Sequence, residues 1–222
     1  MVEDMSRIVI VGGHGKIARL LVTPLVESGH QVVSLVRNPD HAADLEPLGA
    51  EVALLDIESD AAARFAEVFQ GSDVVVFAAG GGPDGNIERK RTVDLGGALK
   101  SIEAATAIGL RRFVQVSAIS VDEPLPDDTE PVWRAYVEAK RDADIALRAS
   151  DLDWTIIRPG RLTDDPATGL VALGPEVERG DVTRADVAAV LAAVIDDPRT
   201  IGHQWNLVGG DQSVAASVDA LV

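Results

Sequence analysis

The chain has 222 residues, of which 46% are hydrophobic, 4% are aromatic and none is cysteine. Disulfide bonds, thiolate metal ligands and a cysteine nucleophile are therefore excluded. The formal net charge of −16 would repel nucleic acid and anionic membranes, so neither is an expected partner. The length favours a single domain, residues 1–222, with a substantial core of stacked helices and strands.

The composition also favours a cytoplasmic protein without a metal centre. The four histidines are scattered and lack a ligand spacing. No apolar run approaches the roughly 18 residues of a membrane span, and the acidic start "MVEDMSR" differs from a signal peptide. The acidic surface suits a salt-rich cytoplasm, where ions screen self-repulsion, or reflects a biased genome composition, and both explanations stay open.

Apolar runs of strand length alternate with helical patterns along the chain. In chain order the sequence predicts strand 7–12, helix 16–29, strand 31–37, helix 39–48, strand 51–56, helix 60–70, strand 73–80, helix 86–108, strand 111–117, a Pro- and Asp-rich loop, helix 132–149, strand 153–159, an irregular stretch, helix 183–197, strand 203–209 and a short helix. Because the strands are rich in Val, Ile and Leu, helices should cover both sheet faces. We expect a doubly wound α/β fold of the Rossmann type, a parallel sheet with a small C-terminal substrate-side segment, whose ligand site lies at the carboxyl ends of the strands.

The first strand runs into a glycine-rich turn, "GGHGKIA" (12–18). Gly12 permits a tight turn, Gly15 lets the backbone approach a pyrophosphate, and Ala18 allows close helix–sheet packing. The next helix offers free N–H groups and the positive end of its dipole to phosphate. We predict a dinucleotide site here; the alternative is a tight turn without a ligand. The candidate cofactor-binding residues are Gly12, Gly13, His14, Gly15, Lys16 and Ile17, of which His14 and Lys16 face either phosphate or solvent.

The second predicted strand ends with Arg37, where a carboxylate would indicate a free ribose 2′-hydroxyl. A guanidinium offers a planar fork to a 2′-phosphate instead, so we predict NADP(H) as the cofactor. The alternative is an exposed arginine without a ligand contact. Asp56 and Ile57 end the third strand where an adenine would lie, and Asp56 either accepts a hydrogen bond from the adenine amino group or caps the following turn.

Seven segments occur in an order that resembles a known group. They are "GGHGKIA", "LVRNPD", "LLD", "VVVFAAGG", a serine ending the fifth strand, Y-x-x-x-K and "TIIRPGRLT". Together they resemble the atypical short-chain dehydrogenase/reductases, small NAD(P)-binding proteins often described as epimerase-like or NmrA-like, over nearly the whole chain. The long C-terminal domain with which sugar-nucleotide epimerases hold their substrates has no counterpart here, which argues against epimerase activity.

This resemblance implies roles for individual residues. Ser117 and Tyr136 would address the substrate oxygen, Lys140 would bind the nicotinamide ribose, and Asp94 falls where the group usually has Asn or Asp. It also implies cofactor contacts for Ala78, Ala79, Gly80, Ser117, Lys140, Pro159, Gly160 and Arg161. Helices 86–108 and 132–149 lie where related folds often dimerise, so a homodimer is an expectation by analogy.

Tyr136 and Lys140 share a stripe of helix 132–149 whose other members are apolar. A lysine in a stripe that faces the sheet requires partners for its ammonium. A nearby ammonium would lower the tyrosine pKa, and the phenol could then exchange a proton with a substrate oxygen while Ser117 steadies that oxygen. The alternative is that Tyr136 packs, Lys140 extends to solvent, and no proton moves.

The sequence thus favours an NADP(H)-dependent oxidoreductase acting on a small carbonyl-type substrate, with Tyr136, Lys140, Ser117 and Asp94 as catalytic residues. A second hypothesis is a non-catalytic binding module that senses NADP(H) and passes that state to a partner. A third is a flavin- or biliverdin-type reductase, in which Tyr136 has no role.

Overall fold

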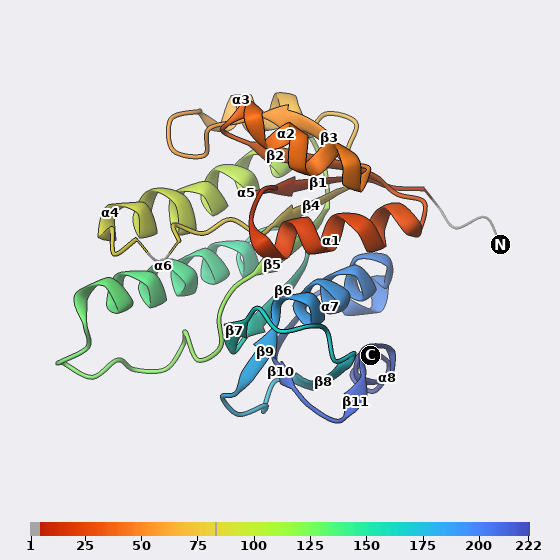
Figure 1. Cartoon of the computed structure of the whole chain (residues 1–222). Coiled ribbons are helices and arrows are strands. Elements are labelled where there is room, and N and C mark those ends of the chain that lie inside the picture. The colour runs from red at the N-terminus through yellow and green to blue at the C-terminus, as the bar shows by residue number, and fades with distance from the viewer. Residues whose placement is uncertain (1–4, 83) are drawn as a thin grey trace.

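The computed structural model describes residues 5–82 and 84–222 and is built around one large sheet (Figure 1). Its strands are β1 (Arg7–Val11), β2 (Gln31–Val36), β3 (Glu51–Leu54), β4 (Val74–Phe77), β5 (Arg112–Val116), β6 (Asp153–Pro159), β7 (Arg161–Thr163), β8 (Leu170–Gly174), β9 (Asp181–Thr183), β10 (His203–Gly209) and β11 (Gln212–Ser213). The nine-stranded sheet has the order β11-β8-β10-β6-β5-β4-β1-β2-β3, and β7 pairs with β9 in a separate two-stranded sheet. The reversal between β1 and β4 creates the crevice in which such folds bind ligands.

Helices cover both faces of the sheet, as expected for a doubly wound fold (Figure 1). They are α1 (Lys16–Glu27), α2 (Ala42–Leu45), α3 (Ala62–Phe69), α4 (Ile87–Arg89), α5 (Ala98–Ala107), α6 (Pro131–Arg148), α7 (Arg184–Asp196) and α8 (Val214–Asp219). Short 3₁₀ turns occur at Pro39–His41, Glu46–Leu48 and Pro198–Thr200, and a π-helix spans Lys90–Gly97.

Alternate residues of each central strand enter two separate cores. In β1, Ile8 and Ile10 pack with α1 and α7, whereas Val9 and Val11 pack with α3, α5 and α6. This is the alternation that a strand buried on both faces requires. The parallel pairing of β1 with β2 and with β4 then aligns their carboxyl ends along one edge. The predicted α/β fold class is confirmed.

The sheet is not parallel throughout, which corrects the expectation for its C-terminal part. β10 is parallel to β6, but β8 is antiparallel to β10 and β11 is antiparallel to β8. The stretch between 160 and 182, which we expected to be irregular, contains β7, β8 and β9. These strands are short, and they form because they pair with distant segments and not because of their local composition.

Two predicted helices differ in detail. The helix expected at 39–48 is a series of short turns. Pro39 begins the first, Pro47 is the second residue of the last, and Gly49 ends that last turn in a left-handed conformation. The helix expected at 86–108 contains the π-helix. Gly97 lies in that segment, and a Cβ there would come within 2.5 Å of Ile57 Cγ2, so the wide turn packs closely against the segment after β3.

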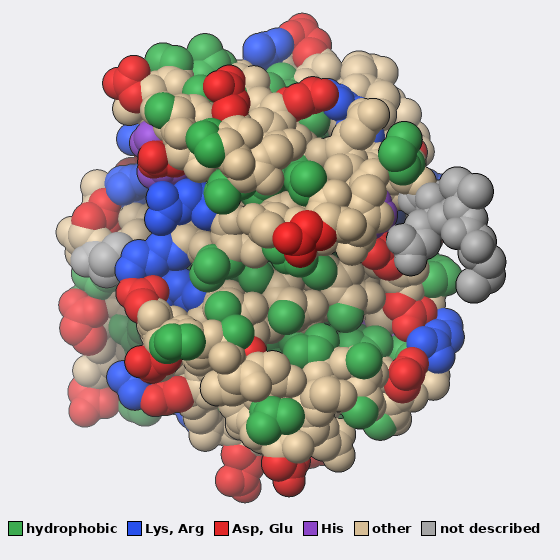
Figure 2. Space-filling view, turned by 45° about the vertical axis from the view of Figure 1, so that its right-hand side comes forward, with side chains coloured by type: hydrophobic (Ala, Val, Ile, Leu, Met, Phe, Trp, Pro, Cys, Tyr) green, Lys and Arg blue, Asp and Glu red, His purple; other side chains and the backbone are tan. Residues whose placement is uncertain are grey.

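The surface follows the acidic composition. On the face shown in Figure 2, Asp and Glu side chains are spread widely, and the largest group of Lys and Arg side chains lies at the left, with others at the top and the right. Within the described residues, none of the helices combines the length and apolar character needed to cross a membrane.

Candidate functional site

The turn between β1 and α1 requires glycine at two positions. Gly12 has φ 82°, and a Cβ there would lie 2.7 Å from Ala79 Cα. At Gly13 a Cβ would lie 2.6 Å from Ser34 Cβ. The turn therefore fits tightly between β2 and β4. Gly15 is the N-cap of α1 and supplies no side-chain hydrogen bond to the first turn. The amides of that turn can therefore donate to an anion.

A cavity of about 350 Å³ opens beside this turn at the carboxyl ends of β1, β2, β3 and β4. Of the predicted cofactor-binding residues, it is lined by Gly12, His14, Gly15, Arg37, Asp56, Ile57, Ala78, Ala79 and Gly80. Leu35, Val36, Asn38, His41, Leu55, Glu58, Arg89 and Val93 complete the lining. Backbone amides, apolar walls and a guanidinium along one cavity match the parts of a dinucleotide.

Asp56 caps the following turn, which is one of its two expected roles, and its contact with an adenine stays a prediction. Its Oδ1 accepts a hydrogen bond from the backbone N–H of Glu58 at 3.0 Å, so it caps the turn after β3. Burial opposes ionisation of this carboxyl, but hydrogen bonds from Glu58 and Ser59 outweigh it, and the pKa of Asp56 is lowered. Asp56 thus lines the cavity as a carboxylate.

Lys16 and His14, which the sequence allowed to face either phosphate or solvent, each pair with a carboxylate. Lys16 pairs with Asp164 in the loop after β7. His14 stacks on His41 at 3.6 Å and contacts Asp44 at 2.8 Å. This hydrogen bond is the main cause of the lowered pKa of Asp44. His14 reaches the cavity, whereas Lys16 does not line it.

The predicted residues after β6 lie outside this cavity. A Cβ at Gly160 would lie 2.0 Å from the Gly180 carbonyl oxygen, so Gly160 allows close passage of the segment before β9. Arg161 is exposed and pairs with Asp181. Gly13, Ile17 and Pro159 also do not line the cavity.

A buried ion pair joins the predicted catalytic lysine to the π-helix. Lys140 Nζ lies 3.5 Å from Asp94 Oδ1, and both side chains are buried. The ammonium also donates to the carbonyl oxygens of Val116 at 3.1 Å and Ala79 at 3.4 Å. Asp94 Oδ2 accepts from the Gly81 N–H at 2.8 Å. Lys140 therefore has the partners that a lysine facing the sheet requires, and it connects the ends of β4 and β5.

Ser117 belongs to a second buried network, centred on Asp144 of α6. The Ser117 hydroxyl donates to Asp144 Oδ2 at 2.8 Å, and Gln115 Nε2 donates to Oδ1 at 2.6 Å. Arg158 of β6 lies against the same carboxylate, with Nε at 2.8 Å and Nη2 at 2.7 Å. Burial raises the pKa of Asp144, and its partners oppose that rise. We did not identify Asp144 from the sequence, although it follows Lys140 by four residues and so shares its face of the helix.

The expected lowering of the Tyr136 pKa is wrong for this arrangement. Burial raises the pKa of Tyr136, and the negative charges of Asp94 and Asp144 raise it further. Lys140 has its ammonium against Asp94, so its charge is largely compensated. Tyr136 also packs at 5.3 Å against the ring of Trp133, which is half exposed. The phenol is therefore held in its neutral form.

Comparisons with known proteins agree with this geometry. A family model described as NAD(P)H-binding matches residues 12–198. The Bacillus subtilis (strain 168) protein YhfK, described as an uncharacterized sugar epimerase, is 34% identical over 216 residues, which cover 97% of this chain and 100% of that protein.

Two solved structures share the whole architecture. A protein from Bacillus halodurans, provisionally described as an NAD-dependent epimerase/dehydratase, is 37% identical, with a TM-score of 0.90 over 97% of this chain and 100% of that one. The oxidoreductase ylbE from Lactococcus lactis is 26% identical, with a TM-score of 0.86 over 97% and 96% of the two chains.

Proposed function

The chain belongs to the NAD(P)H-binding family of atypical short-chain dehydrogenase/reductases, and from this premise we propose that it is an NADP(H)-dependent oxidoreductase acting on a small carbonyl-type substrate. The observation that carries the proposal is Arg37, which directly follows β2 and lines the same cavity as Gly15, the N-cap residue of α1. A guanidinium at this place suits a 2′-phosphate.

In this proposal, different residues of the chain bind the cofactor, orient the reacting groups and donate the proton. The first-turn amides of α1 bind the pyrophosphate, and Arg37 binds the phosphate on the adenosine side. Bound NADPH would supply the hydride. Lys140, fixed by Asp94, orients groups at the ends of β4 and β5. Tyr136, kept neutral by its surroundings, donates its phenolic proton to a substrate oxygen as negative charge develops there.

One observation favours the second reading, a non-catalytic NADP(H)-binding module. Lys140 is compensated by Asp94, and the Ser117 hydroxyl already donates to Asp144. Neither group is then free to activate a tyrosine in the way expected from the sequence. Under this reading the same residues stabilise the fold around a cofactor-sensing cavity.

A single set of measurements separates these functions. NADPH is mixed with aldehydes, ketones, quinones, flavins and linear tetrapyrroles, and its oxidation is followed for the wild type and for Tyr136→Phe. The sugar-epimerase description of the B. subtilis relative adds nucleotide sugars to the panel. Cofactor affinity of both proteins is measured by titration, so that a loss of turnover can be separated from a loss of binding.

We expect carbonyl turnover by the wild type and at least a hundredfold loss in Tyr136→Phe with unchanged NADPH affinity, because the proton donor contributes on this order. Equal turnover in both proteins would remove Tyr136 from the reaction and would favour the flavin- or biliverdin-type reductase. Tight NADPH binding without turnover of any acceptor would favour the sensing module. Absence of NADPH and NADP binding would refute all three.

A further inference from the structure

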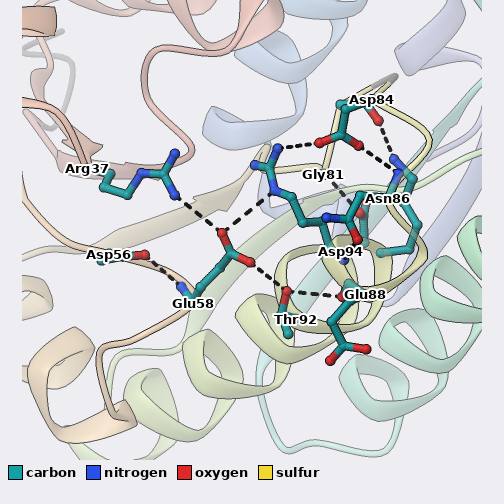
Figure 3. A network of polar contacts seen from close by, with 12 residues as sticks. Arg37, Asp56, Glu58, Gly81, Asp84, Asn86, Glu88, Thr92 and Asp94 are labelled. Carbon is teal, nitrogen blue, oxygen red and sulfur yellow. Dashed lines mark hydrogen bonds and ion pairs between the residues drawn. The ribbon is translucent and has the colours of Figure 1, made fainter.

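The carboxylate of Glu58 lies between two guanidinium groups on the wall of the cavity. Figure 3 shows Arg37 and Glu58 pointing toward one another from the segments that follow β2 and β3. Glu58 Oε2 is 3.3 Å from Arg37 Nη1 and 3.7 Å from Arg89 Nε, so one oxygen faces both cations. The three residues come from three separate segments and all line the same cavity.

Glu58 is held firmly in this position. The Thr92 hydroxyl donates to its Oε1 at 2.8 Å, and its backbone N–H donates to Asp56 at 3.0 Å (Figure 3). Lys100 Nζ donates to its carbonyl oxygen at 3.1 Å. The backbone is therefore fixed, and the carboxylate is the one part that can turn away by rotation of the side chain.

Arg89 is oriented from the opposite side. Its Nη1 donates to Asp84 at 2.7 Å, and Asp84 in turn accepts from the Asn86 N–H at 3.1 Å. Its Nε is buried and has no hydrogen-bond partner within residues 5–82 and 84–222, although Glu58 Oε2 lies 3.7 Å away. A buried N–H donor directed at an anion just beyond hydrogen-bond range favours an acceptor that comes closer.

We propose that Arg37 and Arg89 form one subsite for the 2′-phosphate of NADP(H), and that Glu58 is an internal anion which the phosphate must displace. Two guanidinium groups converging on one point are suited to a phosphate monoester, which offers more oxygens and more charge than a carboxylate. The proposal rests on the proposed function, which invokes Arg37 alone. It adds Arg89 as a phosphate ligand and Glu58 as the residue that sets the preference between the two cofactors.

The charges explain why Glu58 would affect the two cofactors differently. A 2′-phosphate that enters while the Glu58 carboxylate remains in place meets a like charge at close range. A 2′-hydroxyl can instead donate a hydrogen bond to that carboxylate, so NADH binds without displacing it. Glu58 thus lowers affinity for NADPH selectively, while the two arginines raise it.

Glu58→Gln tests this directly, because glutamine keeps the shape and can still accept from Thr92. Dissociation constants for NADPH and NADH are measured by titration of the purified variant and the wild type. We expect NADPH to bind about tenfold more tightly and NADH to bind no more tightly, which is the size expected for removing one like charge beside a partly exposed phosphate. Glu88→Gln is the matched control, because Glu88 is exposed and its nearest cation is Arg91 at 4.0 Å.

Arg89→Gln tests the second ligand. NADPH affinity should fall at least tenfold with NADH affinity unchanged, and Arg91→Gln, which removes an exposed neighbouring cation, should alter neither. An unchanged ratio of the NADPH and NADH constants in Glu58→Gln, or in Arg89→Gln, overturns the inference. If Arg37→Gln abolishes an NADPH preference that Arg89→Gln leaves intact, the proposed function survives and the two-arginine subsite does not. If the wild type binds neither cofactor, both fail.

Discussion

Replacing Asp144 by alanine should destabilise the protein strongly, because this carboxylate is the centre of a buried polar network. Asp144 is fully buried on the face of α6 that packs against the sheet. It accepts hydrogen bonds from Gln115 at 2.6 Å, Ser117 at 2.8 Å and Arg158 at 2.8 Å. Its removal takes an acceptor from three donors at once.

The magnitude follows from what is left behind. Arg158 is 4% exposed, and its remaining carboxylate partner, Asp122 at 2.8 Å, is itself about half exposed. Breaking a buried ion pair from one side costs about 3–5 kcal/mol, because the other charge stays buried without compensation. For a protein of this size each kcal/mol lowers the Tm by about 2–4 °C, so Asp144→Ala should lower it by roughly 10 °C.

Urea unfolding followed by circular dichroism, together with thermal melts, measures this effect. Asp142→Ala is the matched control, because Asp142 lies on the same helix, is half exposed and pairs with Arg141 at 3.4 Å. The control should change stability by less than about 0.5 kcal/mol. A free energy of unfolding for Asp144→Ala within 1 kcal/mol of the control would refute the reasoning about the buried network.

Two further predictions concern packing and pH. Gly97→Ala should lower the free energy of unfolding in urea by about 1–3 kcal/mol, because its Cβ would lie 2.5 Å from Ile57 Cγ2, where the π-helix packs against the segment after β3. Wild-type stability would contradict this. Burial opposes ionisation of Asp186, but hydrogen bonds from Gly169, Thr168 and Thr183 outweigh it, so its pKa is lowered from 3.8. The ionised group therefore stabilises the fold above that value, and this contribution is lost as pH falls through the lowered pKa. Asp186→Asn should flatten the loss of stability that occurs as pH falls below the ordinary aspartate pKa of 3.8, and an unchanged acid dependence would contradict the assignment.

The sequence predicted the parts of the fold that depend on local patterns. Strands β1 to β6 follow from runs of Val, Ile and Leu, and α1 follows from the glycine turn that precedes it. β8 has a similar apolar run, "LVALG", yet it is antiparallel to β10. Local composition does not determine that choice, because it depends on which distant strand edge is open.

The candidate site shows the same difference between residues set by local patterns and residues brought together by long-range folding. Gly12, Gly15 and Arg37 were predictable because each occupies a fixed place at the junction of a strand and the following segment. Glu58 and Arg89 were not, because they meet Arg37 only through the folding of three segments separated along the chain. No periodicity or spacing in the sequence brings these residues together.

Asp144, unlike Glu58 and Arg89, could have been recognised from the sequence. Helical spacing places it one turn beyond Lys140, on the stripe that faces the sheet. We interpreted that stripe as apolar apart from Lys140, whereas the structure buries Asp144 there with Arg158 as its counter-ion. A carboxylate in such a stripe predicts a buried cation on the facing strand, and Arg158 in "TIIRPGRLT" is an arginine within an otherwise apolar strand.

The charges around Tyr136 affect whether this residue is better suited to donate a proton during reduction or to remove one during oxidation. A lysine four residues away suggests a phenolate that removes a proton from an alcohol. Here Asp94 compensates that lysine, burial raises the pKa of the phenol, and the charges of Asp94 and Asp144 raise it further. A phenol whose pKa is raised is a weaker acid, but its neutral form is the one that can donate to an oxygen whose basicity rises as hydride arrives at the adjacent carbon. Removal of a proton from an alcohol requires the phenolate, which these surroundings disfavour. The arrangement therefore suits reduction of a carbonyl better than oxidation of an alcohol.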